Sequence, residues 1–117
     1  MDAERVASIN DMVRDRVPGL RAKYVFTEGV HDLVDKEAKL RSRVKLEVIE
    51  ELFQAISKTQ IDPGDNPHGE RDFGVFYFLG QKFFWKIDYY DQSFESFECP
   101  YEGNPIRLLT VMLAEEY

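Results

Sequence analysis

Five side chains in the second half of the sequence could do acid–base or metal chemistry. His68, Glu70 and Asp72 lie at two-residue steps, and Asp88 and Asp91 follow after an aromatic stretch. Pairing of strands around that stretch would bring the earlier acids close to the later ones. Carboxylates beside an imidazole suit a divalent metal ion or a general acid–base pair. A small metal-assisted or acid–base enzyme that uses these five residues is therefore one open hypothesis.

The same residues also have a purely structural interpretation. Asp65, Asn66 and Asp72 lie in a segment rich in Pro and Gly, where such side chains bond to nearby backbone amides and tie a loop together. Asp88 can pair with Lys86 two residues earlier. The spacing of the oxygen-bearing residues matches no EF-hand template. Both interpretations stay open at this point.

Other catalytic chemistry finds little support. Cys99 is the only cysteine, which excludes an internal disulfide and a zinc site built from cysteines. The sequence contains no nucleophile elbow, no His-Glu-x-x-His motif and no phosphate-binding loop. The tripeptide 72–74 spells the kinase magnesium motif, but 117 residues cannot hold the other parts of a kinase. We expect a protein that is not an enzyme and uses no cofactor.

Aromatic rings alternate with carboxylates between residues 84 and 102. Rings beside charges are typical of surfaces that bind other proteins, because aromatic side chains anchor and charges steer. The residues that we expect to contact a partner are Asp88, Tyr90, Asp91, Phe94, Glu95, Phe97, Glu98, Tyr101 and Glu102. The alternative is a second, minor core in which the loop covers Phe84 and Tyr90.

The elements in the first half are predicted from apolar spacing and breakers. Apolar residues at three- and four-residue steps predict a helix over 3–16, which Pro18 and Gly19 end. A short strand follows at 24–27, then a single helical turn at 30–35. A longer helix is expected at about 38–58.

The second half begins with an ordered loop over 61–72 and continues as a β-hairpin around Gly80 and Gln81. Its second strand, 83–89, alternates a core-like set of side chains with a half-wet set. After the loop 91–103, Asn104 and Pro105 predict the start of a last helix. The order α-β-α-β-β-α predicts an α+β fold, with a small antiparallel sheet of about three strands and helices on one face.

Composition and charge limit the function classes. The 117 residues, 44% hydrophobic and 32% charged, predict a single domain spanning 1–117. The net charge is −7, and residues 62–117 carry all of it. An acidic chain disfavours direct binding to nucleic acid. No apolar run reaches the roughly 20 residues of a membrane span. Without a recognisable signal peptide, we expect a cytoplasmic protein with no membrane partner.

Four segments resemble one family: 9–14 (IleAsnAspMetValArg), 65–74, 85–91 and 109–117. Together they are similar to the bacterial domain-of-unknown-function family numbered 3768, and the resemblance covers nearly the whole chain. It implies a small cytoplasmic protein of proteobacterial genomes and plasmids, often encoded among mobile elements. The sequence departs from the family at Arg71, where His is usual, and in the loop 92–104, which lacks the usual Asp-Pro-rich sequence. The first departure weakens a metal pair at positions 68 and 71.

The leading functional hypothesis is a non-catalytic interaction module. Its acidic, aromatic half would bind the basic surface of a larger bacterial nucleic-acid-binding protein. The mobile-element setting implied by the resemblance favours an inhibitor of a defence complex, of the anti-CRISPR or anti-restriction type, by partial imitation of DNA charge. A homodimeric structural module is a second alternative, beside the enzyme hypothesis above.

Overall fold

The predicted hairpin forms half of a four-stranded sheet. The structure is a computed structural model and describes residues 2–117. Strands β2 (Phe73–Phe78) and β3 (Gln81–Tyr90) pair antiparallel, with Gly74 opposite Trp85. Leu79 and Gly80 connect them with φ angles of 50° and 74°. Positive φ at two turn residues matches the twist of a hairpin, so the prediction at this position is confirmed.

The last predicted helix is wrong, because residues Ile106–Leu113 form strand β4. β4 pairs with β3 on one side and with β1 (Ala22–Phe26) on the other. The apolar residues of β4 lie at 106, 108, 109 and 111–113, and this spacing also fits one side of a helix. Pairing on both edges, which spacing cannot reveal, decides in favour of the strand.

The sheet has the order β1-β4-β3-β2 and is mixed rather than antiparallel, because β1 runs parallel to β4. The α+β class is confirmed, but the predicted count of about three strands and the predicted element order are wrong. The observed order is α-β-α-α-β-β-β, with two short 3₁₀ turns, η1 (Pro63–Asp65) and η2 (Ala114–Glu116).

Three helices complete the fold. Helix α1 (Ala3–Arg14) begins at the Asp2 carboxylate, which accepts the backbone N–H of Arg5 at 2.8 Å. The predicted single turn at 30–35 is a full helix, α2 (Glu28–Leu40), and the predicted helix 38–58 is the shorter α3 (Lys45–Ser57). Chain reversal between them places Ser42 at a φ of 50°. Burial of Val30 and Val34 against α3 stabilises α2.

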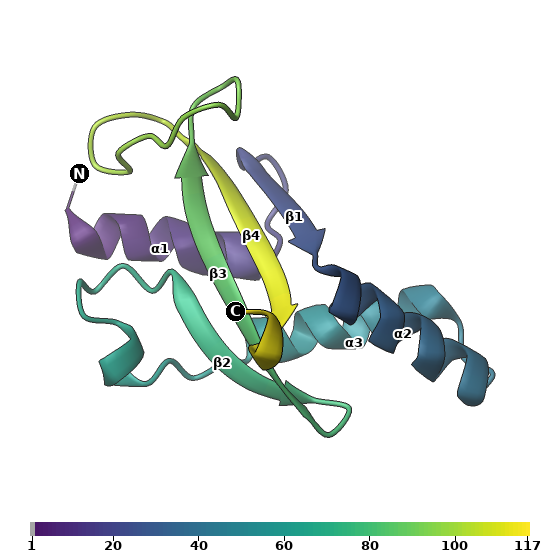
Figure 1. Cartoon of the computed structure of the whole chain (residues 1–117). Coiled ribbons are helices and arrows are strands. Elements are labelled where there is room, and N and C mark those ends of the chain that lie inside the picture. The colour runs from purple at the N-terminus through teal and green to yellow at the C-terminus, as the bar shows by residue number, and fades with distance from the viewer. Residues whose placement is uncertain (1) are drawn as a thin grey trace.

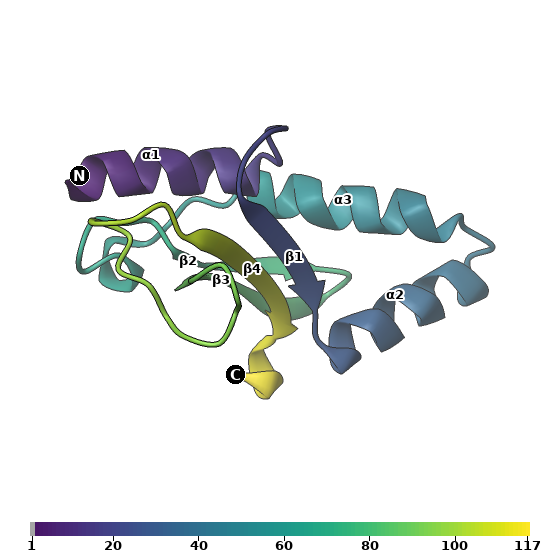
Figure 2. The ribbon, with the colours of Figure 1, turned by 90° about the horizontal axis from the view of Figure 1, so that it is seen from above.

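The elements form two layers. Helices α1 and α3 lie in a row along one side of the sheet, and α2 extends past β1 (Figures 1 and 2). Phe83, Trp85 and Ile87 of β3 point into this layer and are buried, as their alternation predicts. We call this side of the sheet the covered face.

No helix formed by residues 2–117 covers the other side, which we call the open face (Figure 2). Lys86 and Asp88 form an ion pair of 3.0 Å there, and Val25 of β1 is exposed. At one end the chain terminus folds back, so that the ring of Tyr117 meets Phe84 edge-on at a centroid distance of 5.3 Å. At the other end lies the 91–104 loop.

No helix formed by residues 2–117 is both long enough and apolar enough to cross a lipid bilayer.

Candidate functional site

Three aromatic side chains cluster where the open face meets the 91–104 loop. Tyr90, the last residue of β3, stacks on Phe97 with centroids 4.9 Å apart and contacts Phe94 at 5.6 Å. An isolated β-bridge between Tyr90 and Phe97 folds the loop back onto the strand. Phe97 nevertheless stays 74% exposed and Phe94 38% exposed. We call these three side chains the ring patch.

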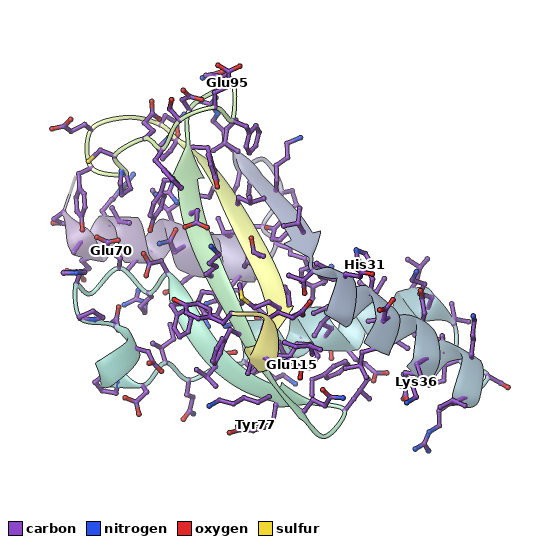
Figure 3. All side chains as sticks on the ribbon, in the orientation of Figure 1. His31, Lys36, Glu70, Tyr77, Glu95 and Glu115 are labelled. Atoms are coloured by element: carbon purple, nitrogen blue, oxygen red, sulfur yellow. The ribbon has the colours of Figure 1, made fainter. Side chains whose placement is uncertain are left out.

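Carboxylates alternate with the rings of the patch along the 91–104 segment. The 91–104 segment contains four of them and no Lys or Arg. Glu95 lies at the outer tip of the loop (Figure 3) and, like Glu102, is exposed. Asp91 accepts hydrogen bonds from the hydroxyl and backbone N–H of Ser93 at 2.7 and 3.0 Å, and these bonds lower the pKa of its carboxyl. The rings and most of the predicted acids therefore share one end of the molecule.

Three predicted partner-contact residues have other roles. Asp88 pairs with Lys86 on the open face. Half-buried Glu98 holds the loop through its backbone, which donates to the carbonyl of Tyr89 at 3.0 Å. The hydroxyl of Tyr101 donates to the carboxylate of Glu70, beside the first half of α1 rather than at the ring patch. The minor-core alternative is thus realised only in part, because the loop covers Tyr90 incompletely.

A buried polar network lies under α1 on the covered face. Asn10 is fully buried, and its side-chain amide donates to the Tyr89 hydroxyl at 2.8 Å and to the backbone carbonyl of Glu70 at 3.0 Å. Its carbonyl oxygen accepts from Nε of Arg107 at 2.8 Å. The guanidinium also lies 5.3 Å from the ring centroid of Tyr89. Burial raises the pKa of Tyr89 and lowers that of Arg107.

Two carboxyl groups lie at the outer edge of this network. Burial raises the pKa of Asp72, and a hydrogen bond with Glu70 raises it further because the two groups share a proton readily. Tyr89 donates a long hydrogen bond of 3.4 Å to Asp72. The bond to Glu70 raises the pKa of Tyr101 to about 12. A carboxyl that keeps its proton to higher pH can act as a general acid.

The five residues of the enzyme hypothesis do not form one cluster. Asp88 lies on the opposite face of β3 from Tyr89, because neighbouring residues of a strand alternate. Asp91 bonds to its own loop, and His68 is exposed. Only Glu70 and Asp72 come together, and no group of three or more His, Cys, Asp or Glu among residues 2–117 is placed to hold a metal ion.

The structural interpretation of the 61–72 loop is confirmed at Asn66, and Asp62, which it did not include, makes a bond of the same kind. Asn66 accepts the backbone N–H of Arg71 at 2.9 Å, and Asp62 accepts that of Gly64 at 2.8 Å. Arg71 in turn binds Asp11 of α1 through Nε and Nη2, the shortest contact being 2.7 Å. Arg71 therefore anchors the loop to α1 by an ion pair in which two of its nitrogens contact the Asp11 carboxylate.

Sequence analysis missed Asn10 and Arg107. Each interrupts an apolar pattern: Asn10 lies on the buried face of α1 between Val6 and Val13, and Arg107 lies within the apolar run of β4. A polar residue at a core position usually has a buried partner, so both interruptions were available as signals. The contact between Asn10 and Arg107 could not be predicted, because it depends on assigning 106–113 as a strand and not as a helix.

Comparison with known families finds a match over residues 26–116 to the family described as Protein of unknown function (DUF3768). No curated protein and no solved structure matches the chain.

Proposed function

The chain belongs to the DUF3768 family, and from that starting point we propose that it is a non-catalytic interaction module whose ring patch binds a basic surface of a larger protein. The match covers β2, β3, β4 and the whole 91–104 loop, so the ring patch lies within the family's domain.

One observation carries this proposal: the ring patch is clustered yet exposed. Phe94 and Phe97 contact Tyr90 but leave much of their surface in water. A stable soluble domain gains more by burying such rings, and aromatic side chains provide much of the binding energy at interfaces. Stacking on Tyr90 also fixes the rings before a partner arrives, which reduces the entropy lost on binding.

The surrounding charge indicates the kind of partner. Glu95, Glu102 and Asp91 give the loop a negative potential that no Lys or Arg of the 91–104 segment offsets. Such a patch accelerates association with basic surfaces and makes it sensitive to salt. Grooves that hold nucleic acid are strongly positive, because their Lys and Arg side chains neutralise phosphates.

Partial imitation of DNA charge follows from this pairing. The carboxylates would take the place of phosphates in the groove, and the rings would slow dissociation. A net charge of −7 is modest, so the imitation would be confined to the patch. In the mobile-element setting that the family resemblance implies, the partner would be a host defence complex such as a CRISPR effector or a restriction enzyme.

A second candidate is general acid–base chemistry at Asp72 and Glu70. The raised pKa of Asp72 is the observation that favours it. Because these carboxyls and the ring patch use different residues, Asp72→Asn would abolish such an activity and leave binding through the rings intact.

The test is capture from a bacterial lysate with tagged protein at about 50 mM and about 500 mM salt. Three forms are compared: wild type, Phe97→Ser and the charge variant Glu95→Lys with Glu102→Lys. Leu46→Ser is the control for Phe97→Ser, since Leu46 on α3 is 75% exposed and Phe97 74%. Glu47→Lys, also on the exposed side of α3, controls for the charge change.

We expect a nucleic-acid-binding protein that wild type and both controls retain at low salt and that both ring-patch variants lose. The purified partner should then release labelled DNA when wild type is added. Failure of every captured protein to depend on Phe97 and Glu95 would contradict the proposal. A dimer in sedimentation that Phe97→Ser dissociates would favour the homodimeric module instead.

A further inference from the structure

A cavity of about 290 Å³ lies between α1, the turn that follows it and the first residues of β4. Arg5, Ile9 and Met12 line it from α1, where steps of four and three residues put them on one side of the helix. Leu20 and Arg21 line it from the turn, and Arg107 lies at the β4 side.

The cavity is basic in an acidic protein. Three of its lining residues are arginines and none is Asp or Glu, although Asp and Glu outnumber Lys and Arg by 22 to 15 in the chain. Arg21 is held at the cavity edge, because its Nη1 donates to the backbone carbonyl of Asn104 at 2.8 Å. The remaining lining residues are Gly19, Asn104 and the four apolar residues Ile9, Met12, Val13 and Leu20.

Arg107 is the unusual member of this set. The residue is only 4% exposed, and its Nη2 is buried with no hydrogen-bond partner among the described residues. None of the ion pairs formed by residues 2–117 includes it. Its protein contacts are the neutral oxygen of Asn10 and the ring of Tyr89.

A buried guanidinium without a counter-ion is unfavourable. Arginine stays protonated in proteins, so the charge cannot be removed by loss of a proton. Folded proteins pair nearly all buried polar groups, and a buried charge that lacks a partner destabilises the fold strongly. An anion in the adjoining cavity would supply the missing counter-charge.

We propose that this cavity binds the oxyanion head, carboxylate or phosphate, of a small molecule with an apolar part. The Arg107 guanidinium supplies positive charge to the head from the β4 side, and Arg5 and Arg21 add to it. The apolar part contacts Ile9, Met12 and Leu20. A volume of about 290 Å³ limits the ligand to roughly the size of a single substituted ring. The inference is independent of the proposed function, because no ring-patch residue lines the cavity.

The experiment is a calorimetric and NMR titration of the full chain with four probes: phenyl phosphate, benzoate, inorganic phosphate and benzyl alcohol. We expect saturable binding of at least one aromatic anion, with amide shifts at Gly19, Leu20 and Arg21. Inorganic phosphate should bind more weakly because it lacks an apolar part, and neutral benzyl alcohol should not bind. Absence of saturable binding by both aromatic anions would overturn the proposal, as would equal binding of benzyl alcohol.

Variants locate the site. Arg107→Gln should abolish binding, but this change also alters the buried network and risks misfolding. The double variant Arg5→Gln with Arg21→Gln therefore keeps the test decisive, since neither charge is fully buried. Loss of two positive charges beside the anion predicts at least about tenfold weaker binding for the pair. Arg41→Gln, at the exposed α2 end, is the control and should bind as wild type does. Unchanged affinity in the double variant would place the anion elsewhere and refute the assignment.

Discussion

The two faces of the sheet carry similar aromatic residues, which are buried on one face and partly exposed on the other. On the covered face, Phe83 and Trp85 are completely buried and pack under α1 and α3. On the open face, Tyr90 holds Phe94 and Phe97 in a cluster that water still reaches. All come from the same aromatic stretch of sequence. Alternation along β3 puts Phe83 and Trp85 on one face and Tyr90 on the other, and the loop then folds Phe97 back onto Tyr90.

The polar groups differ in the same way. The covered face contains the Asn10–Arg107 pair, of which Asn10 is 0% and Arg107 4% exposed. The open face contains the Lys86–Asp88 pair, which solvent screens. A buried hydrogen-bonded charge matters to stability far more than an exposed ion pair does. Substitutions on the covered face should accordingly change the free energy of unfolding more than substitutions on the open face do.

The largest difference is expected between two neighbouring leucines of β4. Leu109 is fully buried on the covered face, whereas Leu108 is half-buried on the open face. Leu109→Ala should lower the free energy of unfolding by about 2–5 kcal/mol, because it removes core contacts and leaves a cavity. Leu108→Ala should lower it by about 1 kcal/mol, in proportion to its smaller buried area. Urea denaturation of both variants measures the difference, and equal losses would refute the contrast.

The polar pairs give the next largest contrast. Asn10→Ala leaves Nε of Arg107 without its acceptor and the Tyr89 hydroxyl without its donor, so we expect the free energy of unfolding to fall by about 2–3 kcal/mol. Lys86→Gln breaks only the exposed ion pair and should change stability by less than about 0.5 kcal/mol. Thermal and denaturant unfolding should agree on this order. A small effect of Asn10→Ala would mean that the network contributes little.

Close packing between β2 and β3 provides a third test. A Cβ added to Gly74 would lie 2.4 Å from Nε1 of Trp85, which is too close. Gly74→Ala should therefore destabilise the protein by about 1–3 kcal/mol, since the covered face must shift to admit it. The same change in a Trp85→Phe background should have a smaller effect, because the six-membered ring leaves room. Equal effects in both backgrounds would exclude this contact as the cause.

The smallest expected effects are pH-dependent and opposite in sign. Burial and Glu70 raise the pKa of Asp72 in the folded state, so ionisation of Asp72 opposes folding as pH rises above the unfolded value of 3.8. Asp72→Asn should thus stabilise the protein near neutral pH and have no such benefit at about pH 3. The pKa of Asp91 is lowered, so its ionised form favours folding. Asp91→Asn should destabilise near neutral pH, and this difference should vanish in acid.

Denaturation curves across this pH range decide the question. If both variants shift stability in the same direction, the environments assigned to the two carboxyls are wrong. Asp72→Asn also keeps a side chain that accepts from Tyr89, so the comparison isolates the charge.

Local sequence signals were sufficient for several parts of the fold. The hairpin around Gly80, the alternation of Phe83, Trp85 and Ile87, and helix α1 all follow from contacts between near neighbours in sequence. The errors fall where partners are distant. The length of α2 depends on packing against α3, and β4 depends on pairing with β1, more than 80 residues earlier.

The candidate sites also differ in whether their residues are close together or far apart in the sequence. The ring patch lies within one continuous segment, and its exposure at Phe94 and Phe97 agrees with the expectation from the interleaved acids. The five-residue catalytic cluster fails because alternation turns Asp88 away from Glu70 and Asp72. The arginine-lined cavity could not be foreseen, because it joins residues from α1, a turn and β4.

The sequence by itself determined the α+β class, the acidic second half and the alternation that gives β3 two unlike faces, since each depends on composition or on neighbours a few residues apart. Only the tertiary structure decided that 106–113 is a central strand and that Arg107 meets Asn10, which lies 97 residues before it. The physical reason is that a strand gains its hydrogen bonds, and a buried charge its partner, from chain that local spacing does not describe.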